Sequence, residues 1–410
     1  MYLIAKDKKG DMIPPKTKRF ITRLLPFGLI WLFSGWVFLT IEYAATVDAE
    51  QLPATAIQLD WQILIMASLA VTLAGFFTGY IELRYLDPWL NHLHFGRRLL
   101  LKLLAYALVF SLIILITFPL AASLEMNISL RDPRVWSRYL DYLFSITHLS
   151  TALQLGMSLL LSLFYAEISE FMGQGVLRNF FTGRYHQPVE EDRVFMFLDM
   201  KSSTTMAEQL GHGTYFRLLK AYYDCFSDAI IEHEGEIYQY VGDEIILSWR
   251  YREGGIDNRP LDCFFAMRDS LRAKAAWFEK HFGVAPTFKA GLHLGRVTTG
   301  EIGTIKKEIL FSGDVLNTTA RIQGLCNSYR VDLIVSERML HLFDLGASKQ
   351  AEHLGEASLR GRQAPLDLFT VSYVLNHAEI NVDLPKTRRL YLRMGKTRRF
   401  LLTFPFMEMY

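Results

Sequence analysis

Two aspartates stand at the ends of apolar runs in the second half of the chain. Asp199 ends the run V-F-M-F-L-D, which begins at Val194, and Asp243 follows a glycine between I-Y-Q-Y-V and E-I-I-L-S-W, which ends at Trp249. A lone aspartate at a strand end is usually a turn or helix-cap residue. Two carboxylates held on rigid strand ends also supply the oxygen ligands that divalent cations prefer. The pair therefore favours a cation site over two independent caps.

A run of small hydroxyl residues follows Asp199 directly. Ser202, Ser203 and Thr204 lie where a helix is expected to begin after the first strand. Main-chain N–H groups at a helix N-terminus attract anions, so a phosphate group next to carboxylate-bound cations is a coherent arrangement. Ordinary Ser/Thr capping explains the same composition equally well.

A third group of polar residues lies further along the chain, in D-V-L-N-T-T-A-R-I-Q. Asn317 and Arg321 are four residues apart, which places both on one face of a helix. An arginine beside an asparagine can offer a charged fork and a neutral amide to one ligand. A solvated surface pair is the more common explanation. Arg360 and Arg362, in L-R-G-R, taken alone are surface charge.

Together these segments resemble the catalytic domain of class III nucleotidyl cyclases, the adenylyl and guanylyl cyclases. The resemblance covers about residues 190–375. It rests on the motifs F-L-D-M-K-S-S-T, Y-V-G-D-E-I-I-L-S-W, A-G-L-H-L-G-R-V-T-T-G-E-I-G, G-D-V-L-N-T-T-A-R-I and L-R-G-R. The apolar N-terminal half is similar to that of membrane-anchored bacterial members.

The resemblance implies a reaction and a role for each motif. Two divalent cations, Mg²⁺ or Mn²⁺, would be held at Asp199, Met200 and Asp243. They would assist attack of the ribose 3′-hydroxyl on the α-phosphorus of ATP, giving 3′,5′-cyclic AMP and pyrophosphate. Asn317 would orient the ribose.

The resemblance also assigns the phosphates and the partner. Arg321 and Arg360 would neutralise charge developing on the phosphates. The β- and γ-phosphates would contact Ser202, Ser203 and Thr204. Sites in this family form between two domains packed head to tail, and one such domain is present, so a homodimer with two shared sites is expected.

The residues expected to select the base depart from the family. Adenine-selective members usually carry Lys four residues before the second metal aspartate, and Asp or Thr seven residues before the asparagine. Here these positions hold Gln239 and Leu310, which do not match the usual guanine-selective pair either. Gln can both donate and accept a hydrogen bond, whereas Leu can do neither. ATP is favoured because it is the usual substrate of such bacterial enzymes. Guanylyl or other NTP cyclase activity stays open, as does a non-catalytic domain that only binds nucleotide or dimerises.

Positioning these residues requires alternating strands and helices after residue 194. We expect a strand at 194–199, a helical stretch at about 202–233, a hairpin around Gly242-Asp243 and a helix at 260–282. The segment F-K-A-G-L-H-L-G-R-V-T-T-G-E-I-G predicts a strand, a glycine-broken turn and a return strand. Strand–helix pairs and a last hairpin follow. This order predicts an α+β fold with a mixed, mainly antiparallel sheet and flanking helices.

The first half of the chain reads as an all-α, four-helix transmembrane domain at 21–166. Apolar runs near 21–45, 61–82, 99–123 and 140–166 each approach the roughly 20 residues needed to span a bilayer. The N-terminal tail is rich in Lys and Arg, while the first loop has neither. This asymmetry predicts a multi-pass protein of the inner (plasma) membrane with its N-terminus and catalytic domain in the cytoplasm, although the third loop has mixed charge.

The expected organisation is a tail at 1–20, the membrane domain, a helical linker at 167–193, a catalytic domain at 194–375 and a basic extension at 376–410. The linker is either passive or signal-transmitting. The extension is either an extra hairpin, which is slightly favoured, or a segment lying on an anionic membrane face. His92, His94 and His148 are expected to be loop and packing residues, with His148 kept as a candidate for sensing.

Composition excludes several other classes. A formal net charge of +2 gives no case for nucleic-acid binding. The three cysteines, Cys225, Cys263 and Cys326, follow no metal-binding spacing and are expected to be reduced thiols. The polar N-terminus does not predict a cleaved signal peptide. A transporter is disfavoured because the sequence suggests no paired charges within the spans.

Overall fold

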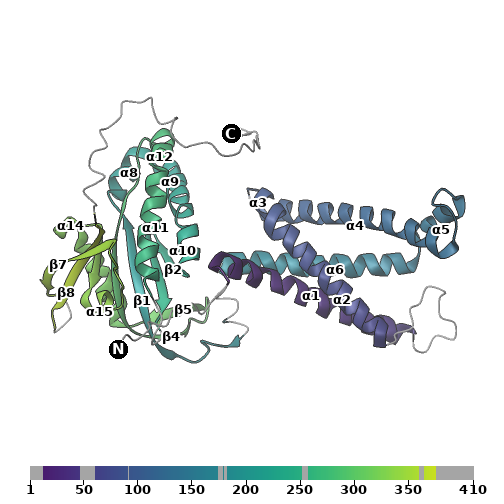
Figure 1. Ribbon diagram of the computed structural model, residues 1–410, viewed down its shortest axis with the longest axis horizontal. Coiled ribbons are helices and arrows are strands. Elements are labelled where there is room, and N and C mark those ends of the chain that lie inside the picture. Colours follow the sequence, from purple (N-terminus) through teal and green to yellow (C-terminus); the bar gives the residue numbers. More distant parts are fainter. Residues whose placement is uncertain are drawn as a thin grey trace, which may run out of the picture.

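The computed structural model describes residues 13–46, 61–90, 92–173, 179, 182–251, 257–359 and 364–374. Figure 1 shows a bundle of long helices and, beside it, a sheet with helices packed on its faces. The expected fold class is confirmed: an all-α apolar half precedes an α+β half with a mixed sheet.

The helical half contains long apolar helices and short connecting ones. Their bounds are α1 Pro15–Thr46, α2 Trp61–Ile81, the π-helical segment η1 Glu82–Leu86, α3 Asp87–Leu90, α4 Phe95–Met126, α5 Pro133–Leu143 and α6 Ile146–Met172. Four segments are long and apolar enough to cross a membrane, within Pro15–Ile41, Leu64–Leu90, Phe95–Leu120 and Ile146–Met172. The helices pack around Trp31, Tyr106, Leu159 and Leu163.

The fourth apolar run is not one helix. Residues 140–143 belong to α5, which ends before Phe144, and α6 begins at Ile146 with Ser145 as its N-cap. The Ser145 hydroxyl accepts a hydrogen bond from the His148 N–H at 3.1 Å. Capping of this kind starts a new helix where hydropathy alone suggests continuity. At its other end α6 runs on to Met172 and stops at Gly173, whose φ is +86°, as the glycines of the linker predict.

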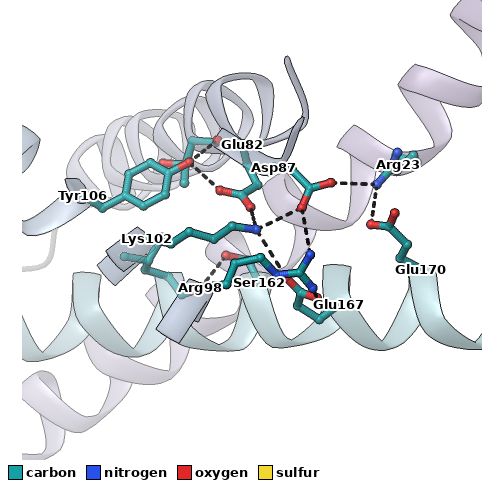
Figure 2. A network of polar contacts seen from close by, with 11 residues as sticks. Arg23, Glu82, Asp87, Arg98, Lys102, Tyr106, Ser162, Glu167 and Glu170 are labelled. Carbon is teal, nitrogen blue, oxygen red and sulfur yellow. Dashed lines mark hydrogen bonds and ion pairs between the residues drawn. The ribbon is translucent and has the colours of Figure 1, made fainter. Parts of the chain in front are cut away.

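Charged side chains are paired inside the helical half, contrary to the expectation from sequence. The Lys102 ammonium lies 2.5 Å from the Glu82 carboxylate, and both side chains are 2% exposed (Figure 2). These residues stand at the ends of two apolar runs, where charged residues are usually taken as flanks of a span. The expectation that the spans hold no paired charges is therefore wrong.

The α+β half is built on one mixed sheet in the described residues. The strands are β1 Val189–Met200, β2 Glu236–Val241, β3 Glu244–Arg250, β4 Phe288–Ile302, β5 Glu308–Ser312, β6 Leu333–Ser336, β7 Lys349–Ala357 and β8 Leu366–Tyr373. They lie in the order β2-β3-β1-β4-β6-β8-β7, with β5 paired to β4. Among the described strands, β4 and β6 pair in parallel and the other pairs are antiparallel.

Helices cover both faces of this sheet. They are α8 Ser203–Leu210, α9 His212–Asp224, α10 Ser227–Glu232, α11 Arg259–Ala273, α12 Ala275–Phe282, α13 Asp314–Gly324, α14 Cys326–Tyr329 and α15 Glu337–Leu340. One face packs against α9, α10, α11 and α12 through the largest apolar core, and the other packs against α13. All three cysteines are buried and free, consistent with reduced thiols.

Several expected elements have different boundaries. The helical stretch at 202–233 is three helices, broken at Gly211, whose φ is +71°, and again near Cys225. The helix at 260–282 breaks at Lys274. The expected glycine-broken turn is wrong, since β4 runs unbroken and the return strand is β5.

Two glycines of β4 allow α13 to pack closely against the strand. A Cβ at Gly291 would lie 2.6 Å from the main-chain nitrogen of Gln323, and one at Gly295 would lie 2.8 Å from Val315 Cβ. These glycines let α13 approach the strand closely.

Candidate functional site

Asp199 lies on the face of β1 that α13 covers. Because side chains alternate along a strand, Val194, Met196 and Leu198 enter the large core, while Asp199 is on the opposite face. Its Oδ2 accepts a hydrogen bond from Gln323 Nε2 at 3.2 Å and lies 3.3 Å from Lys289 Nζ. The strand thus fixes the carboxylate between the sheet and the C-terminal end of α13.

Asp243 is held in the turn between β2 and β3. Gly242 adopts a φ of +63°, and its carbonyl accepts a hydrogen bond from the Tyr223 hydroxyl at 2.6 Å. Asp243 Oδ2 is buried and has no hydrogen-bond partner among the described residues. A buried carboxylate oxygen without a donor is costly, so this position suits a ligand that accepts electron pairs.

The two aspartates perturb each other and a third acid. Burial first, and then the neighbouring Asp243 carboxylate, raise the pKa of Asp199, while Lys289 lowers it. Burial together with Asp199 and Asp243 raises the pKa of Glu244, the cross-strand neighbour of Asp199, to about 7. Three acidic side chains are therefore crowded at the adjoining ends of β1, β2 and β3. A bound divalent cation would reduce the repulsion between their carboxylates.

The donor set fits a hard divalent cation but is incomplete in the part of one chain that the structure describes. There, no three His, Cys, Asp or Glu side chains gather to hold a metal ion. The Met200 side chain is 2% exposed in the core on the far side of β1, so only its main-chain carbonyl can serve. Further oxygen ligands would have to come from water or from substrate phosphates.

The hydroxyl run begins α8 as expected. Ser202 precedes the helix with a φ of +57°, and its side chain makes no capping hydrogen bond. Capping therefore does not account for the Ser202 hydroxyl. Ser202 and Thr204 are exposed, and Ser203 is half-buried. The first N–H groups of α8 lack intrahelical partners, as at any helix start, and can meet an anion.

Asn317 and Arg321 lie on α13 as expected, Asn317 exposed and Arg321 half-buried. The Arg321 Nη1 is buried without a hydrogen-bond partner among the described residues. No hydrogen bond or ion pair joins Asn317 or Arg321 to Asp199 or Asp243 within the described part of this chain. The structure thus brings the two aspartates together, and no described contact joins Asn317 or Arg321 to them.

The two base-selecting positions, Gln239 and Leu310, are both exposed. Gln239 lies on edge strand β2 beside a register shift, paired with Ile246 of β3. Leu310 lies on β5 opposite Gly300 and is 39% exposed. Arg360, Arg362 and the basic extension at 376–410 lie outside the described residues.

Sequence reasoning missed Lys289 and Gln323. Both contact Asp199 through long-range pairing: β4 lies beside β1, so that Lys289 pairs with Asp199, and α13 crosses the same strand. The only signal available was the small residue at Gly291, which marks the close approach of α13. The histidines singled out in the helical half lie outside this site. His92 and His94 are exposed, and the ring centroid of His148 lies 5.1 Å from that of Tyr142.

Comparison with known proteins now identifies this half. Residues 185–376 match the family described as the adenylate and guanylate cyclase catalytic domain. This part of the chain is a class III cyclase domain. The resemblance found in the sequence is confirmed, and residues 185–376 form the cyclase domain.

Relatives that this part of the chain matches are named adenylate cyclases. Adenylate cyclase 2 of Rhizobium meliloti (strain 1021) is 32% identical over 210 residues, covering 51% of this chain and 58% of that protein. Adenylate cyclase 1 of the same organism is 24% identical over 206 residues, covering 49% and 30%. The crystal structure of an adenylyl cyclase from P. aeruginosa is 17% identical, with a TM-score of 0.41, covering 45% of this chain and 96% of that one. The chain thus spans little more than half of the first relative and less of the second.

Proposed function

We propose that this protein is a membrane-bound adenylate cyclase that converts ATP to 3′,5′-cyclic AMP and pyrophosphate. The observation that carries the proposal is the Asp199–Asp243 pair, two crowded carboxylates with one buried oxygen left without a donor. The adenylate cyclases among its relatives support the choice of reaction.

Each side chain then has a task in the reaction. Asp199, Asp243 and the Met200 carbonyl would hold Mg²⁺ or Mn²⁺, which when bound supply Lewis acidity toward the ribose hydroxyl and the triphosphate. The ribose 3′-oxygen loses its proton and attacks the α-phosphorus, and pyrophosphate leaves. Asn317 orients the ribose for this attack.

The other proposed site residues bind the phosphates of ATP. The start of α8, with Ser202, Ser203 and Thr204, meets the β- and γ-phosphates. Arg321 and Arg360 neutralise the negative charge that builds on the transferring phosphate. The buried, unpartnered Nη1 of Arg321 supports this assignment, because a guanidinium oriented by burial is ready for an anion.

The complete site needs a second chain. Asn317 and Arg321 make no bond to the acid pair of their own chain, so we propose a homodimer in which each chain supplies metal ligands to one site and α13 to the other. The apolar helices would anchor both chains in the plasma membrane, with the N-terminus and the cyclase domain in the cytoplasm. The basic N-terminal tail supports this sidedness.

A second candidate function concerns the base of the nucleotide substrate. Gln239 and Leu310 replace the pair typical of adenine-selective members, so guanylyl or another NTP cyclase activity has support from these two residues. Detergent-purified protein incubated with Mn²⁺ and each of the four NTPs, with products identified by mass, tests both. We expect cyclic AMP as the main product. A different cyclic nucleotide would change the substrate, and the absence of any cyclic product from a dimeric sample would refute the proposal.

A further inference from the structure

Seven charged side chains of the helical half form one network of ion pairs, and Figure 2 shows how they point toward one another. We call this group the clasp. Its members come from α1, η1, α3, α4 and α6 and are Arg23, Glu82, Asp87, Arg98, Lys102, Glu167 and Glu170. The clasp therefore includes a residue from each of the four spanning segments.

The centre of the clasp is Lys102. Its ammonium lies 2.5 Å from Glu82, 3.0 Å from Asp87 and 3.3 Å from Glu167. Arg98 forms a further ion pair with Glu167. The buried ammonium group of Lys102 thus links α4 to three other segments, which are η1 at the end of α2, α3 and α6.

The edge of the clasp is Arg23 on α1. Its guanidinium donates a hydrogen bond to Glu170 of α6 at 3.2 Å and lies 3.8 Å from Asp87. Glu170 is the most exposed member, at 56%. Apart from Glu170, the clasp holds three cations and three carboxylates. These six groups have no net charge when all of them are ionised. The cations are Arg23, Arg98 and Lys102, and the carboxylates are Glu82, Asp87 and Glu167.

A neutral ionic cluster of this kind is a costly way to hold apolar helices together. Removing ions from water is costly, and well-packed apolar residues commonly stabilise a fold as well or better. Paired charges at membrane depth are a functional hypothesis by default. The Asp87 N–H bonds to the Glu82 carbonyl in a π-helical turn, a distortion that often marks functional sites.

Two clasp helices lead directly to the cyclase domain. On α1, Lys16 lies 2.9 Å from Glu232 of α10, and Lys18 donates a hydrogen bond to Glu234 at 3.1 Å. Lys18 precedes Arg23 by five residues, roughly 7.5 Å along the helix. Glu234 is followed by β2, which leads into the turn that carries Asp243.

On the other helix the path is covalent. Glu167 and Glu170 lie in the last two turns of α6, which ends at Met172 before the chain continues to β1 and Asp199. The Arg23–Glu170 pair therefore joins α1, which contacts Glu232 and Glu234 ahead of β2, to α6, which precedes β1 in the chain. Its rupture would let α1 and α6 move separately.

We propose that the clasp is a regulatory coupling between the membrane helices and the cyclase domain, and that the Arg23–Glu170 pair sets the basal rate through α1. This inference rests on the proposed function, because the rate it regulates is that of the cyclase. Arg23 acts as a positioning residue. A rearrangement of the spanning helices that breaks the pair would shift the contacts of Lys16 and Lys18 with the cyclase domain.

A charge swap in the full chain tests the proposal. The proteins Arg23→Glu, Glu170→Arg and the double swap are assayed in lipid nanodiscs with Mn²⁺ and ATP. We expect each single change to alter the rate at least about fivefold, the lower end of ordinary allosteric coupling, and the swap to return it to within about twofold. Arg23→Gln should give a milder change in the same direction. Arg84→Gln, at an exposed arginine of η1, is the matched control and should leave the rate unchanged.

A double-mutant cycle tests the route through α1. If Lys18 carries the effect, Arg23→Glu should change the rate much less in a Lys18→Gln background than in the wild type. Purely additive effects would show that α1 does not transmit it, and would overturn the proposal.

A distance measurement separates this proposal from the proposed function. Spin labels at Thr17→Cys and Ser227→Cys, both exposed positions, report on the approach of α1 to α10, while the native cysteines are buried. Arg23→Glu should broaden or shift this distance and the swap should restore it. A changed distance in a protein that makes no cyclic nucleotide would refute the cyclase activity alone. Unchanged rate and distance in an active protein would refute the clasp.

Discussion

At the scale of single residues, the candidate metal site depends on how Asp199 is held. Lys289 and Gln323 both approach its Oδ2, at 3.3 and 3.2 Å. A carboxylate that ligates a metal is usually fixed by such outer contacts, and their loss weakens metal binding without removing a ligand. Gln323 is the better probe, because it is neutral and its removal leaves the charge of the site unchanged.

Replacing Gln323 tests this role. Gln323→Met preserves the length of the side chain but removes the donor to Asp199, so the apparent affinity for Mn²⁺ should fall about 10- to 100-fold. The measurement is the cyclase rate as a function of Mn²⁺ concentration at saturating ATP. Gln350→Met, at an exposed position of β7, should leave the Mn²⁺ dependence as it is. An unchanged dependence in Gln323→Met would remove this residue from the site.

The base-selecting positions make a second prediction at this scale. Gln239→Lys combined with Leu310→Asp installs the pair typical of adenine-selective members. A hydrogen-bonding pair discriminates between bases far better than an apolar side chain, so the ratio of kcat/KM for ATP over GTP should rise at least about tenfold. The ratio is measured for the wild type, both single variants and the double variant. No change in the double variant would mean that neither position reads the base.

At the scale of elements, α13 and β4 form a unit that positions Asn317 and Arg321. The helix approaches the strand so closely that a Cβ at Gly291 would meet the Gln323 main chain at 2.6 Å. Main chain cannot rotate away as a side chain can, so the helix must move. Its displacement would shift every side chain that α13 contributes to a site.

Gly291→Ala should therefore damage activity and stability together. Overpacking of this kind costs about 1–3 kcal/mol, which should lower the Tm of the cyclase domain, and kcat should fall because α13 is displaced. Thermal unfolding and steady-state kinetics measure the two effects. Gly324→Ala places its Cβ in open space at the end of the same helix and should change neither. Normal kcat in Gly291→Ala would separate this packing from catalysis.

Strand β1 is anchored by a buried charge network that makes stability depend on pH. Arg193, 1% exposed, donates hydrogen bonds to Glu191 at 2.7 Å and to Ser248 at 2.8 Å. Burial alone would raise the pKa of Glu191, but the bonds and charges of Arg193, with Thr299 and Arg250, outweigh it and lower the pKa below 4.5. Since the folded-state pKa is the lower one, Glu191 stabilises the fold fully above pH 4.5 and loses this contribution as the pH falls through its folded-state pKa.

The predicted consequence is a loss of stability in acid that Glu191→Gln reduces. The Tm of the wild type should fall as the pH drops below about 4.5, the ordinary glutamate range. In Glu191→Gln the Tm should be lower at neutral pH and fall less steeply in acid. Glu352→Gln, exposed on β7, serves as the control and should follow the wild type. Equal slopes in Glu191→Gln and the wild type would contradict this role.

Local pattern predicted most elements because each strand and long helix has its own apolar period. It placed the β2–β3 hairpin correctly around Gly242 and Asp243. It failed where a residue serves a distant partner: the glycines of β4 read as a turn but accommodate α13, and Lys289 had no meaning before β4 was placed beside β1. The pairing of Glu82 with Lys102 was hidden for the same reason, since it joins the ends of two separate apolar runs.

At the scale of the whole molecule, no described hydrogen bond or ion pair of one chain joins the two proposed half-sites. The acid pair lies on β1 and the β2–β3 turn, while the exposed Asn317 and the unpartnered Arg321 nitrogen belong to α13. Among the described residues, no group donates a hydrogen bond to Asp243 Oδ2 and none accepts one from Arg321 Nη1. A head-to-tail pair of cyclase domains would bring each acid pair to the α13 of the other chain.

Mixing two inactive chains tests this arrangement. Asp199→Ala removes a metal ligand from one half-site and Arg321→Ala removes the phosphate-binding cation from the other, so each homodimer should have less than about one hundredth of wild-type activity. In a heterodimer of the two, one site carries both defects and the other carries none. Co-expressed chains with different tags, purified through both tags in succession, should therefore recover about half the wild-type activity per dimer, as expected for one intact site of two. A mixture of Asp199→Ala with Asp243→Ala is the matched control, because both changes fall in the same half-site and every heterodimer site then lacks a metal ligand. If the first heterodimer were as inactive as this control, each site would have to be formed within a single chain, and α13 would have to reach the acid pair of its own β1.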